Sequence, residues 1–197
     1  LSMIANRAME AELTGFEFAA GIPGTLGGAC VMNAGAYGGE MKDVLETVTV
    51  LTRDGDVKTL TKDELELGYR TSVIAKKDYI VLSAVIRLEN GKKEETKAVM
   101  DDLKEKRITK QPLEYPSAGS TFKRPEGYFA GKLIQDAGLR GFQVGGAQVS
   151  EKHCGFVVNK DQATAADVMN MMNQVSDKVY EMSGVRLEPE VKRLGVF

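Results

Sequence analysis

A glycine-rich stretch between Gly21 and Gly39 constrains this chain more than any other segment. It holds seven of the 21 glycines in the 197-residue sequence. Glycine admits positive φ angles and lets a ligand lie close to the backbone, and successive exposed amides form a nest for phosphate. The glycine spacing matches neither the G-x-G-x-x-G fingerprint nor the Walker loop, so it predicts neither a Rossmann site nor a P-loop. Ordinary tight turns are the alternative, because glycine is also a common turn residue.

The composition is that of an ordinary globular protein. The chain is 43% hydrophobic and 27% charged, with a formal net charge of -2, so we expect no nucleic-acid partner. No apolar run reaches the roughly 20 residues of a membrane helix, and we identify no signal peptide, so we expect no membrane association. Two cysteines, Cys30 and Cys154, and a single histidine form no metal-binding or disulfide pattern. These features predict no metal site and a reducing, cytoplasmic setting.

Basic residues are concentrated in the middle of the chain. They are Lys104, Lys106, Arg107, Lys110, Lys123, Arg124, Lys132 and Arg140. A local excess of this kind could attract an anionic ligand. Solvated faces of helices and loops are the alternative.

Helical and strand patterns alternate along the sequence. Spacing and capping signals predict helices over 1–13, 61–68, 92–106, 128–136 and 164–182. Alternating apolar residues predict strands over 46–52, 57–60, 79–88, 142–149 and 156–159, and an extended segment over 185–194. Asp54-Gly55 predicts a hairpin, and Pro112 and Pro116 mark a domain boundary. The chain opens inside a predicted helix, so we expect it to be a piece of a longer protein.

Three groups of motifs, far apart in the sequence, point to one family. They are Gly24-Thr-Leu-Gly-Gly28 with Asn33-Ala-Gly-Ala-Tyr-Gly38, then Gly68-Tyr-Arg-Thr-Ser72, then Ala118-Gly-Ser-Thr-Phe-Lys123 with Leu187-Glu-Pro-Glu-Val191. In this order and spacing, the chain resembles the UDP-N-acetylenolpyruvoylglucosamine reductase (MurB) family of peptidoglycan synthesis over nearly its whole length. The resemblance implies an α+β fold. Residues 1–108 would be the C-terminal part of an FAD-binding, PCMH-like domain, and residues 109–197 a MurB-type C-terminal substrate-binding domain.

The resemblance also implies a reaction. The family reduces UDP-N-acetylglucosamine enolpyruvate to UDP-N-acetylmuramate by hydride transfer from NADPH through bound FAD. Hydride addition to an enol ether places negative charge on the α-carbon and the carboxylate, so the site needs positive charge and hydrogen-bond donors. By resemblance, Arg70 binds the carboxylate, Glu190 is an acid that polarises the intermediate, and Ser120 delivers a proton to the α-carbon. We expect these three side chains to meet around one pocket.

Each of these residues also has an ordinary interpretation. Ser120 could be a turn hydroxyl, Arg70 the partner in a surface ion pair, and Glu190 a solvent-facing strand residue. For Tyr69, which the resemblance places at the substrate, core packing is the alternative.

The resemblance assigns further residues to ligand binding. The residues expected to contact FAD all lie on the glycine-rich stretch, and they are Ile22, Pro23, Gly24, Thr25, Gly27, Gly28, Asn33, Gly35 and Ala36. Those expected to bind the substrate are Tyr69, Lys110, Lys123 and Arg140.

The chain departs from the family pattern at several positions. Arg124 stands where asparagine is common, Lys192 where arginine is frequent, and His153, to which we assign no catalysis, where some members have glutamine. The substrate-covering loop of the longer family type is absent, which places the chain with the shorter type. Nothing matches the family's N-terminal glycine-rich region, so we expect these residues alone to bind FAD weakly or not at all.

Two other functions stay open on the sequence. The chain could be a nucleotide-sugar binding module without turnover, because hydride transfer has no route without a bound flavin. It could also be a different oxidoreductase of the same flavin-domain superfamily. We leave the oligomeric state open, a monomer included.

Overall fold

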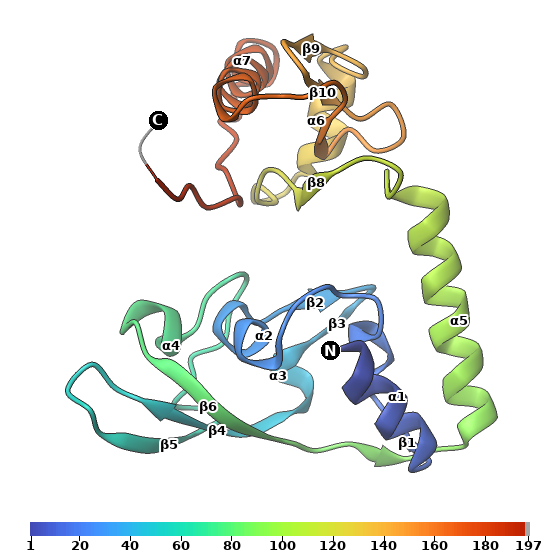
Figure 1. Ribbon diagram of the computed structural model, residues 1–197, viewed down its shortest axis with the longest axis vertical. Helices are drawn as coiled ribbons and strands as arrows, with labels where there is room; N and C mark the ends of the chain where they lie inside the picture. Colours follow the sequence, from blue (N-terminus) through green and yellow to red (C-terminus); the bar gives the residue numbers. More distant parts are fainter. Residues whose placement is uncertain (196–197) are drawn as a thin grey trace. The chain divides into compact units, whose positions relative to one another are not determined.

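The computed structural model describes residues 1–195 as two compact units (Figure 1). The units divide between Arg107 and Ile108, and each has its own hydrophobic core. Helices accompany four small sheets, and all strand pairings in the described residues are antiparallel. The predicted α+β class is therefore confirmed.

The amino-terminal unit contains short helices around a three-stranded sheet of order β5-β4-β6 and two two-stranded sheets, β1-β7 and β2-β3. Its elements are α1 (Ser2–Glu10), β1 (Leu13–Thr14), η1 (Glu17–Ala19), α2 (Leu26–Met32), β2 (Gly35–Ala36), β3 (Gly39–Glu40), α3 (Met41–Val44), β4 (Leu45–Leu51), β5 (Val57–Thr61), α4 (Val73–Lys76), β6 (Ile80–Ile86) and β7 (Glu89–Asn90). Helix α5 (Lys93–Lys110) follows and runs past the division between the units.

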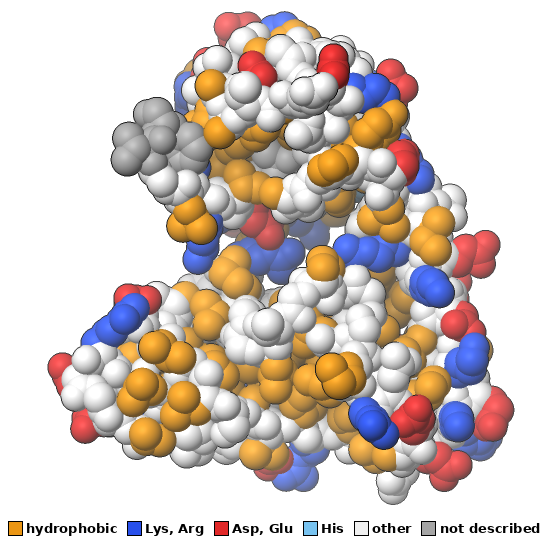
Figure 2. Space-filling view, in the orientation of Figure 1, with side chains coloured by type: hydrophobic (Ala, Val, Ile, Leu, Met, Phe, Trp, Pro, Cys, Tyr) orange, Lys and Arg blue, Asp and Glu red, His pale blue; other side chains and the backbone are white. Residues whose placement is uncertain are grey.

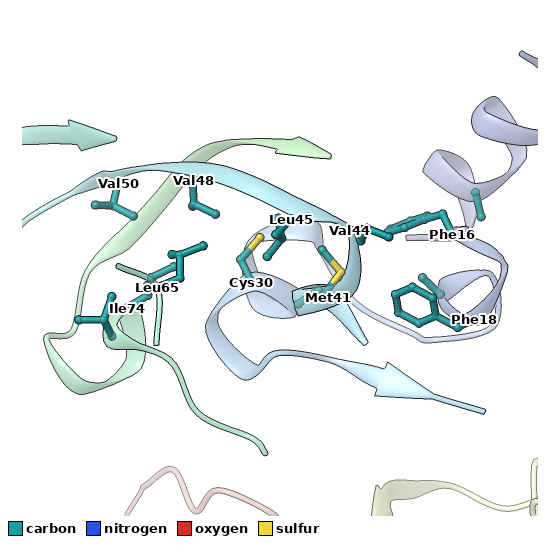
Figure 3. Packing of buried hydrophobic residues seen from close by; sticks show 14 residues of the cluster. Phe16, Phe18, Cys30, Met41, Val44, Leu45, Val48, Val50, Leu65 and Ile74 are labelled. Carbon is teal, nitrogen blue, oxygen red and sulfur yellow. The ribbon is translucent and has the colours of Figure 1, made fainter. Parts of the chain in front are cut away.

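The central strand β4 has one buried and one more exposed face. Val48 and Val50 are fully buried, and Figure 3 shows them directed toward Leu65 and Ile74 of the same core. The period of two follows from the strand geometry, because successive side chains point to opposite faces. The predicted hairpin between β4 and β5 is confirmed, with Gly55 at φ 90° in its turn.

The helix predicted over 61–68 does not form, and the helix predicted over 1–13 is shorter than expected. One bond of the capping box is present at Thr61, from the Thr61 N–H to the Glu64 carboxylate at 2.8 Å, but only a turn follows. The chain leaves the helical path because Glu66 takes φ 45°. The helix predicted over 1–13 ends at Glu10, because Leu13 and Thr14 pair with β7 instead.

The carboxy-terminal unit contains a four-stranded sheet of order β8-β11-β10-β9 and two helices. Its elements are β8 (Ser117–Ser120), α6 (Ala130–Asp136), β9 (Gln143–Val144), β10 (Ala147–Val149), β11 (Phe156–Asn159) and α7 (Ala165–Ser183). Helix α7 corresponds to the helix predicted over 164–182; Thr164 is its N-cap, and Gly184 ends it at φ 71°. Its core-facing residues Met171, Met172, Val175 and Val179 are buried.

The strand predicted over 142–149 is wrong, because the segment folds back as the hairpin β9-β10. Gly145 takes φ 54° at the turn. A Cβ on Gly146 would overlap backbone atoms of Asp161 and Ala163. The segment predicted to be extended over 185–194 forms no regular strand and makes one isolated bridge, between Pro189 and Phe122.

Candidate functional site

The glycine-rich stretch leads into α2 within the amino-terminal unit. Thr25 is the N-cap of this helix, and its Oγ accepts a hydrogen bond from the Gly28 N–H at 3.1 Å. Gly24 has φ 138°, a backbone conformation that only glycine adopts readily. Pro23, Gly24 and Thr25 are exposed, while the Ile22 side chain is half-buried and packs against the core. The segment therefore presents its backbone at the surface.

Two glycines of α2 have no role in the packing of this chain. Neither Gly27 nor Gly28 has a positive φ. A Cβ on Gly27 would lie 3.6 Å from the Val81 Cβ, and one on Gly28 would lie 3.5 Å from the Thr25 Oγ, which are ordinary contacts. Glycine inside a helix costs up to about 1 kcal/mol relative to alanine. Neither the backbone conformation nor a close contact within the described residues explains glycine at these two positions.

Two other glycines of the stretch are required by packing. A Cβ on Gly35 would lie 2.7 Å from the Cβ of Glu40, and one on Gly39 would lie 2.7 Å from the ring of Phe18. Gly35 and Ala36 form β2, which pairs with β3. The glycine at position 35 is therefore explained without a cofactor, and its predicted contact with FAD stays a prediction.

Asn33 connects the glycine-rich stretch to the loop that carries Arg70. It ends α2 at φ 43° and is buried. Its Nδ2 donates to the Glu40 carboxylate at 2.7 Å and to the Gly68 carbonyl at 3.1 Å, and its Oδ1 accepts from the Lys42 N–H at 2.8 Å. Because the side chain amide is used within the chain, only the backbone of Asn33 remains for the predicted cofactor contact.

Tyr69 and Arg70 lie at the tip of a tight turn. Gly68 and Thr71 close it with two backbone hydrogen bonds of 3.1 and 3.3 Å. Arg70 has φ 53°, which is uncommon for a residue other than glycine, asparagine or aspartate. Its guanidinium lies 5.3 Å from the centre of the exposed Tyr69 ring. Glu66 and Asp78 have similar φ angles, so this conformation by itself assigns Arg70 no function.

Ser72 fixes this turn beside α2, a role that sequence reasoning missed. Its hydroxyl donates to the Val31 carbonyl at 2.7 Å and accepts from the Ala75 N–H at 3.1 Å. The second contact is the N-cap of α4, a local pattern that the sequence could have revealed. The first joins residues distant in sequence, and no local pattern predicts it.

Ser120 and Glu190 come close together within the carboxy-terminal unit. Ser120 is the last residue of β8 and is exposed. The next residue, Thr121, accepts a hydrogen bond from the Glu190 N–H at 2.9 Å, and the Lys123 N–H donates to the Glu188 carbonyl at 2.8 Å. Two of the motifs of this unit, 118–123 and 187–191, therefore run side by side.

The buried Thr121 holds this arrangement to the sheet. Its Oγ accepts from the Val157 N–H of β11 at 2.9 Å, and its N–H donates to the Gly155 carbonyl at 2.9 Å. Thr121 also lines a pocket of about 570 Å³ with Ala118, Met172 and Val191. Ser120 is not among the residues that line this pocket. Thr121 therefore contributes to the wall of this pocket, whereas the exposed Ser120 does not.

The basic residues predicted to bind substrate have different settings. Lys110 is exposed at the last position of α5. Lys123 forms an ion pair with Glu188. Arg140 donates to the Glu151 carbonyl and, at 2.9 Å, to the Gln135 side chain, so its guanidinium already supports a loop.

His153 and the two cysteines have structural settings. Burial lowers the pKa of His153, and its Nδ1 accepts from the Gly155 N–H at 3.1 Å. Its ring packs edge-on against Phe156, with 5.0 Å between the ring centres. Burial raises the pKa of the Cys30 thiol to about 11 and also raises the pKa of Cys154. Neither cysteine forms a disulfide.

Residues 1–195 contain no helix long and apolar enough to cross a bilayer. The same residues contain no group of three or more His, Cys, Asp or Glu side chains that could hold a metal ion.

Comparison with known proteins gives two family matches. A model described as "FAD binding domain" matches residues 5–61. A model described as "UDP-N-acetylenolpyruvoylglucosamine reductase, C-terminal domain" matches residues 111–194.

The similar proteins include several UDP-N-acetylenolpyruvoylglucosamine reductases. The UDP-N-acetylenolpyruvoylglucosamine reductase of Agathobacter rectalis is 64% identical over 197 residues, which are 100% of this chain and 63% of that protein. The reductase of Clostridioides difficile is 56% identical over 195 residues, or 99% of this chain and 64% of that protein. A crystal structure of the Thermus caldophilus reductase superimposes with a TM-score of 0.81 at 38% identity, covering 96% of this chain and 68% of that one. The chain thus spans about 63% of the length of its curated relatives.

Proposed function

Because this chain belongs to the UDP-N-acetylenolpyruvoylglucosamine reductase family, we propose that it carries out the reduction of UDP-N-acetylglucosamine enolpyruvate to UDP-N-acetylmuramate in peptidoglycan synthesis. The reductant is NADPH and the cofactor is FAD. The observation that carries the proposal is the pairing of the segment after Ser120 with the segment that ends at Glu190. A different oxidoreductase with a flavin-type domain would not need this pair of motifs.

In this proposal the amino-terminal unit forms one wall of the FAD-binding site. Gly27 and Gly28 leave the backbone at the start of α2 accessible, and Gly24 and Thr25 expose the turn before it. Exposed backbone amides suit an anionic group such as the FAD pyrophosphate. When bound, FAD would relay a hydride from NADPH to the substrate.

Arg70 binds the carboxylate of the enolpyruvyl group in this proposal. Negative charge grows on that carboxylate when hydride adds to the neighbouring carbon, so a fixed cation stabilises the transition state more than the ground state. The planar guanidinium can donate two parallel hydrogen bonds to a carboxylate, which a lysine ammonium cannot copy. Tyr69, adjacent in the same turn, would contact the substrate as well.

Ser120 delivers a proton to the α-carbon, and Glu190 helps to polarise the intermediate. A serine hydroxyl is a weak acid, so this transfer works only toward a strongly basic, carbanion-like carbon held in position. Thr121 accepts hydrogen bonds from the Val157 and Glu190 N–H groups, and these bonds fix the backbone next to Ser120.

Three basic side chains of the carboxy-terminal unit suit the negatively charged diphosphate of the substrate. Lys110 forms no ion pair in the structure of residues 1–195. Lys123 would exchange its contact with Glu188 for the substrate, and Arg140 would hold the loop beside it. The proposed partner is therefore a small UDP-sugar, in a cytoplasmic protein whose free cysteines suit a reducing compartment.

The test is NADPH oxidation that depends on the enolpyruvyl substrate. We would assay this chain with added FAD and, in parallel, a chimera in which this chain replaces the matching region of the Agathobacter rectalis relative. Substrate-dependent oxidation by the chimera supports the proposal. A folded chimera that retains FAD but shows no such oxidation overturns it.

The share of the relative's length that this chain covers supports a second candidate function. Because the chain covers only 63% of that relative, it could bind the nucleotide sugar without turnover. Calorimetry would then show substrate binding to this chain, while NADPH oxidation would be absent from the chain alone.

A further inference from the structure

The pocket of about 570 Å³ that Thr121 lines has no part in the proposed reaction. Its walls come from β8, β11, the first half of α7 and the segment 191–194, all within the carboxy-terminal unit. Ser120, Lys123 and Arg140 are not among the residues that line it. Figure 2 shows hydrophobic side chains around a hollow of this unit, next to the helix labelled α7 in Figure 1. The volume is in the range of small-molecule binding sites.

The floor and one wall of the pocket are aliphatic. Met172 and Val157, which are 2% and 8% exposed, belong to the hydrophobic core of the unit. The half-buried Val168 and Met169 form the wall on α7. None of the described residues that line the pocket is aromatic, so a flat ring would find no stacking partner. Methionine side chains are flexible and adapt to an irregular apolar shape, which suits a hydrocarbon chain.

The polar side chains in the walls already have partners within the chain. The Thr121 Oγ accepts a hydrogen bond from the Val157 N–H at 2.9 Å. The Asn159 Oδ1 accepts one from the Ala163 N–H at 2.9 Å. A sugar or a nucleobase placed here would lose its hydration and gain few hydrogen bonds in return. The pocket therefore favours a ligand whose buried part is apolar.

The rim of the pocket is positively charged. Lys192 and Arg193 both line it and are exposed. Within residues 1–195 neither forms an ion pair, and no Asp or Glu is among the described residues of the lining. Leu194, on the same segment, is 88% exposed. An anionic head group at this rim would meet two cations and no opposing charge.

We propose that this pocket binds an amphiphilic anion, namely an unbranched hydrocarbon chain that ends in a carboxylate. The chain lies over Val157 and Met172, and the carboxylate pairs with Lys192 and Arg193 at the rim. An aliphatic cavity offers water few hydrogen-bond partners and readily takes an apolar group instead. Burial of the chain supplies the affinity, and the two cations select the charge of the head group. The proposal uses neither FAD nor the residues assigned to the reaction, so it does not depend on the proposed function.

Calorimetric titration of the full chain with decanoate, below its micelle concentration, tests the proposal. We expect saturable binding at one site. Octanoate, with two fewer CH₂ groups, should bind roughly 15-fold more weakly, since each buried CH₂ contributes about 0.8 kcal/mol. Decanol, which has the same chain length without the charge, should bind about 5-fold or more weakly than decanoate. Methyl signals of ¹³C-labelled methionines give the location: Met169 and Met172 should shift, and Met3 of the amino-terminal unit should not.

Two adjacent alanines provide a matched pair of variants. Ala165 and Ala166 are both exposed in the first turn of α7, but only Ala165 lines the pocket. Ala165→Phe should fill part of the cavity and weaken decanoate binding by about 10-fold or more. Ala166→Phe should leave the affinity unchanged. Both variants should keep the melting temperature of the parent chain, because neither alanine is buried.

A second pair of variants tests the charged rim. Lys192→Gln combined with Arg193→Gln should weaken decanoate binding by about 5-fold or more and leave decanol binding unchanged. The control combines Lys178→Gln with Arg186→Gln, which removes the same charge from residues outside the lining. It should change neither affinity. Both double variants alter exposed side chains only, so the test remains available where Ala165→Phe does not fold.

Several results would overturn the proposal. One is the absence of saturable decanoate binding to the full chain. Another is equal affinity for decanoate and decanol, which would remove the role of the charged rim. Parent affinity in a folded Ala165→Phe variant would place the ligand elsewhere, and a dimer of the chain that decanoate dissociates would make a second copy the occupant. Turnover is not a readout here, so a failure of the proposed reaction would leave this result unaffected.

Discussion

Glu190 donates its backbone N–H to the carbonyl oxygen of Thr121 over 2.9 Å, and Thr121 directly follows Ser120. The bond joins two segments that are far apart in the sequence. It continues in the bond from Lys123 to Glu188. A carboxyl and a hydroxyl are thereby carried on neighbouring backbones of one unit, as the proposed reaction requires.

Replacing Ser120 by alanine should separate the two halves of the reaction. We expect flavin reduction by NADPH to stay near the parent rate, because the hydroxyl has no part in it. Oxidation of the reduced flavin by substrate should slow by roughly 100-fold or more, the usual range for a lost general acid. Stopped-flow absorbance of the FAD-loaded chimera measures both steps. Ser117→Ala, also on β8 and exposed, is the control, and equal slowing of both steps would assign Ser120 a structural role.

Replacing Arg70 by lysine should impair the substrate step without unfolding the turn. Both side chains must adopt φ 53° at this position, so the backbone cost is the same. The loss of the paired guanidinium donors should slow oxidation of the reduced flavin by about 10-fold or more. Arg53→Lys, at an exposed ion pair with Asp78, should leave the rate unchanged. Normal turnover in Arg70→Lys would move the carboxylate-binding role to another residue.

Replacing Gly28 by alanine should weaken FAD binding while sparing the fold. The new Cβ meets only ordinary contacts within the chain, and alanine should stabilise the helix by up to about 1 kcal/mol. Against a bound cofactor the same Cβ would occupy the space that glycine leaves. Flavin fluorescence titration and thermal unfolding of the chimera give the two quantities. Gly35→Ala has the opposite pattern, because its Cβ would lie 2.7 Å from Glu40 and should lower the melting temperature. Unchanged FAD affinity in Gly28→Ala would remove this glycine from the cofactor wall.

The stability of the carboxy-terminal unit should fall on mild acidification. Burial lowers the pKa of His153 in the folded state below its usual value of 6.5, so the unfolded state binds more protons between the two values. The contribution of His153 to the free energy of unfolding is therefore constant above about pH 6.5. It decreases as the pH falls through the lowered pKa. Urea unfolding at several pH values measures the slope. His153→Gln should reduce the slope, and an unchanged slope would assign it to other groups.

Local sequence signals correctly predicted the elements whose first and last residues are set by residues close in the sequence. Thr164 and Gly184 bound α7 as predicted, and Asp54-Gly55 forms the hairpin turn. The signal at Thr61 failed, because its capping bond forms but Val73 N–H bonds to the Leu65 carbonyl and draws the chain away from a helix. A contact between residues eight apart outweighed a local preference, which no window of a few residues could reveal.

The candidate site was predictable only in part. The motifs identified the family, and the comparisons confirm that resemblance. The roles of Ser120, Arg70 and Glu190 stay predictions, since they depend on bound ligands. Ser72 and Thr121, which hold the neighbouring segments in place, gave no signal because their partners Val31 and Val157 lie 41 and 36 residues away.

The sequence by itself determined the family, the α+β class and the glycine-rich stretch, because these depend on residue types and their order. Only the tertiary structure decided how the glycines are used. A Cβ on Gly35 or Gly39 would overlap atoms of this chain, whereas a Cβ on Gly27 or Gly28 would make only ordinary contacts. It also decided that β6 pairs with β4 as its one strand partner among residues 1–195, although the sequence of β6 would equally suit a central strand. Both distinctions depend on which distant residues come into contact, and this is a property of the folded chain.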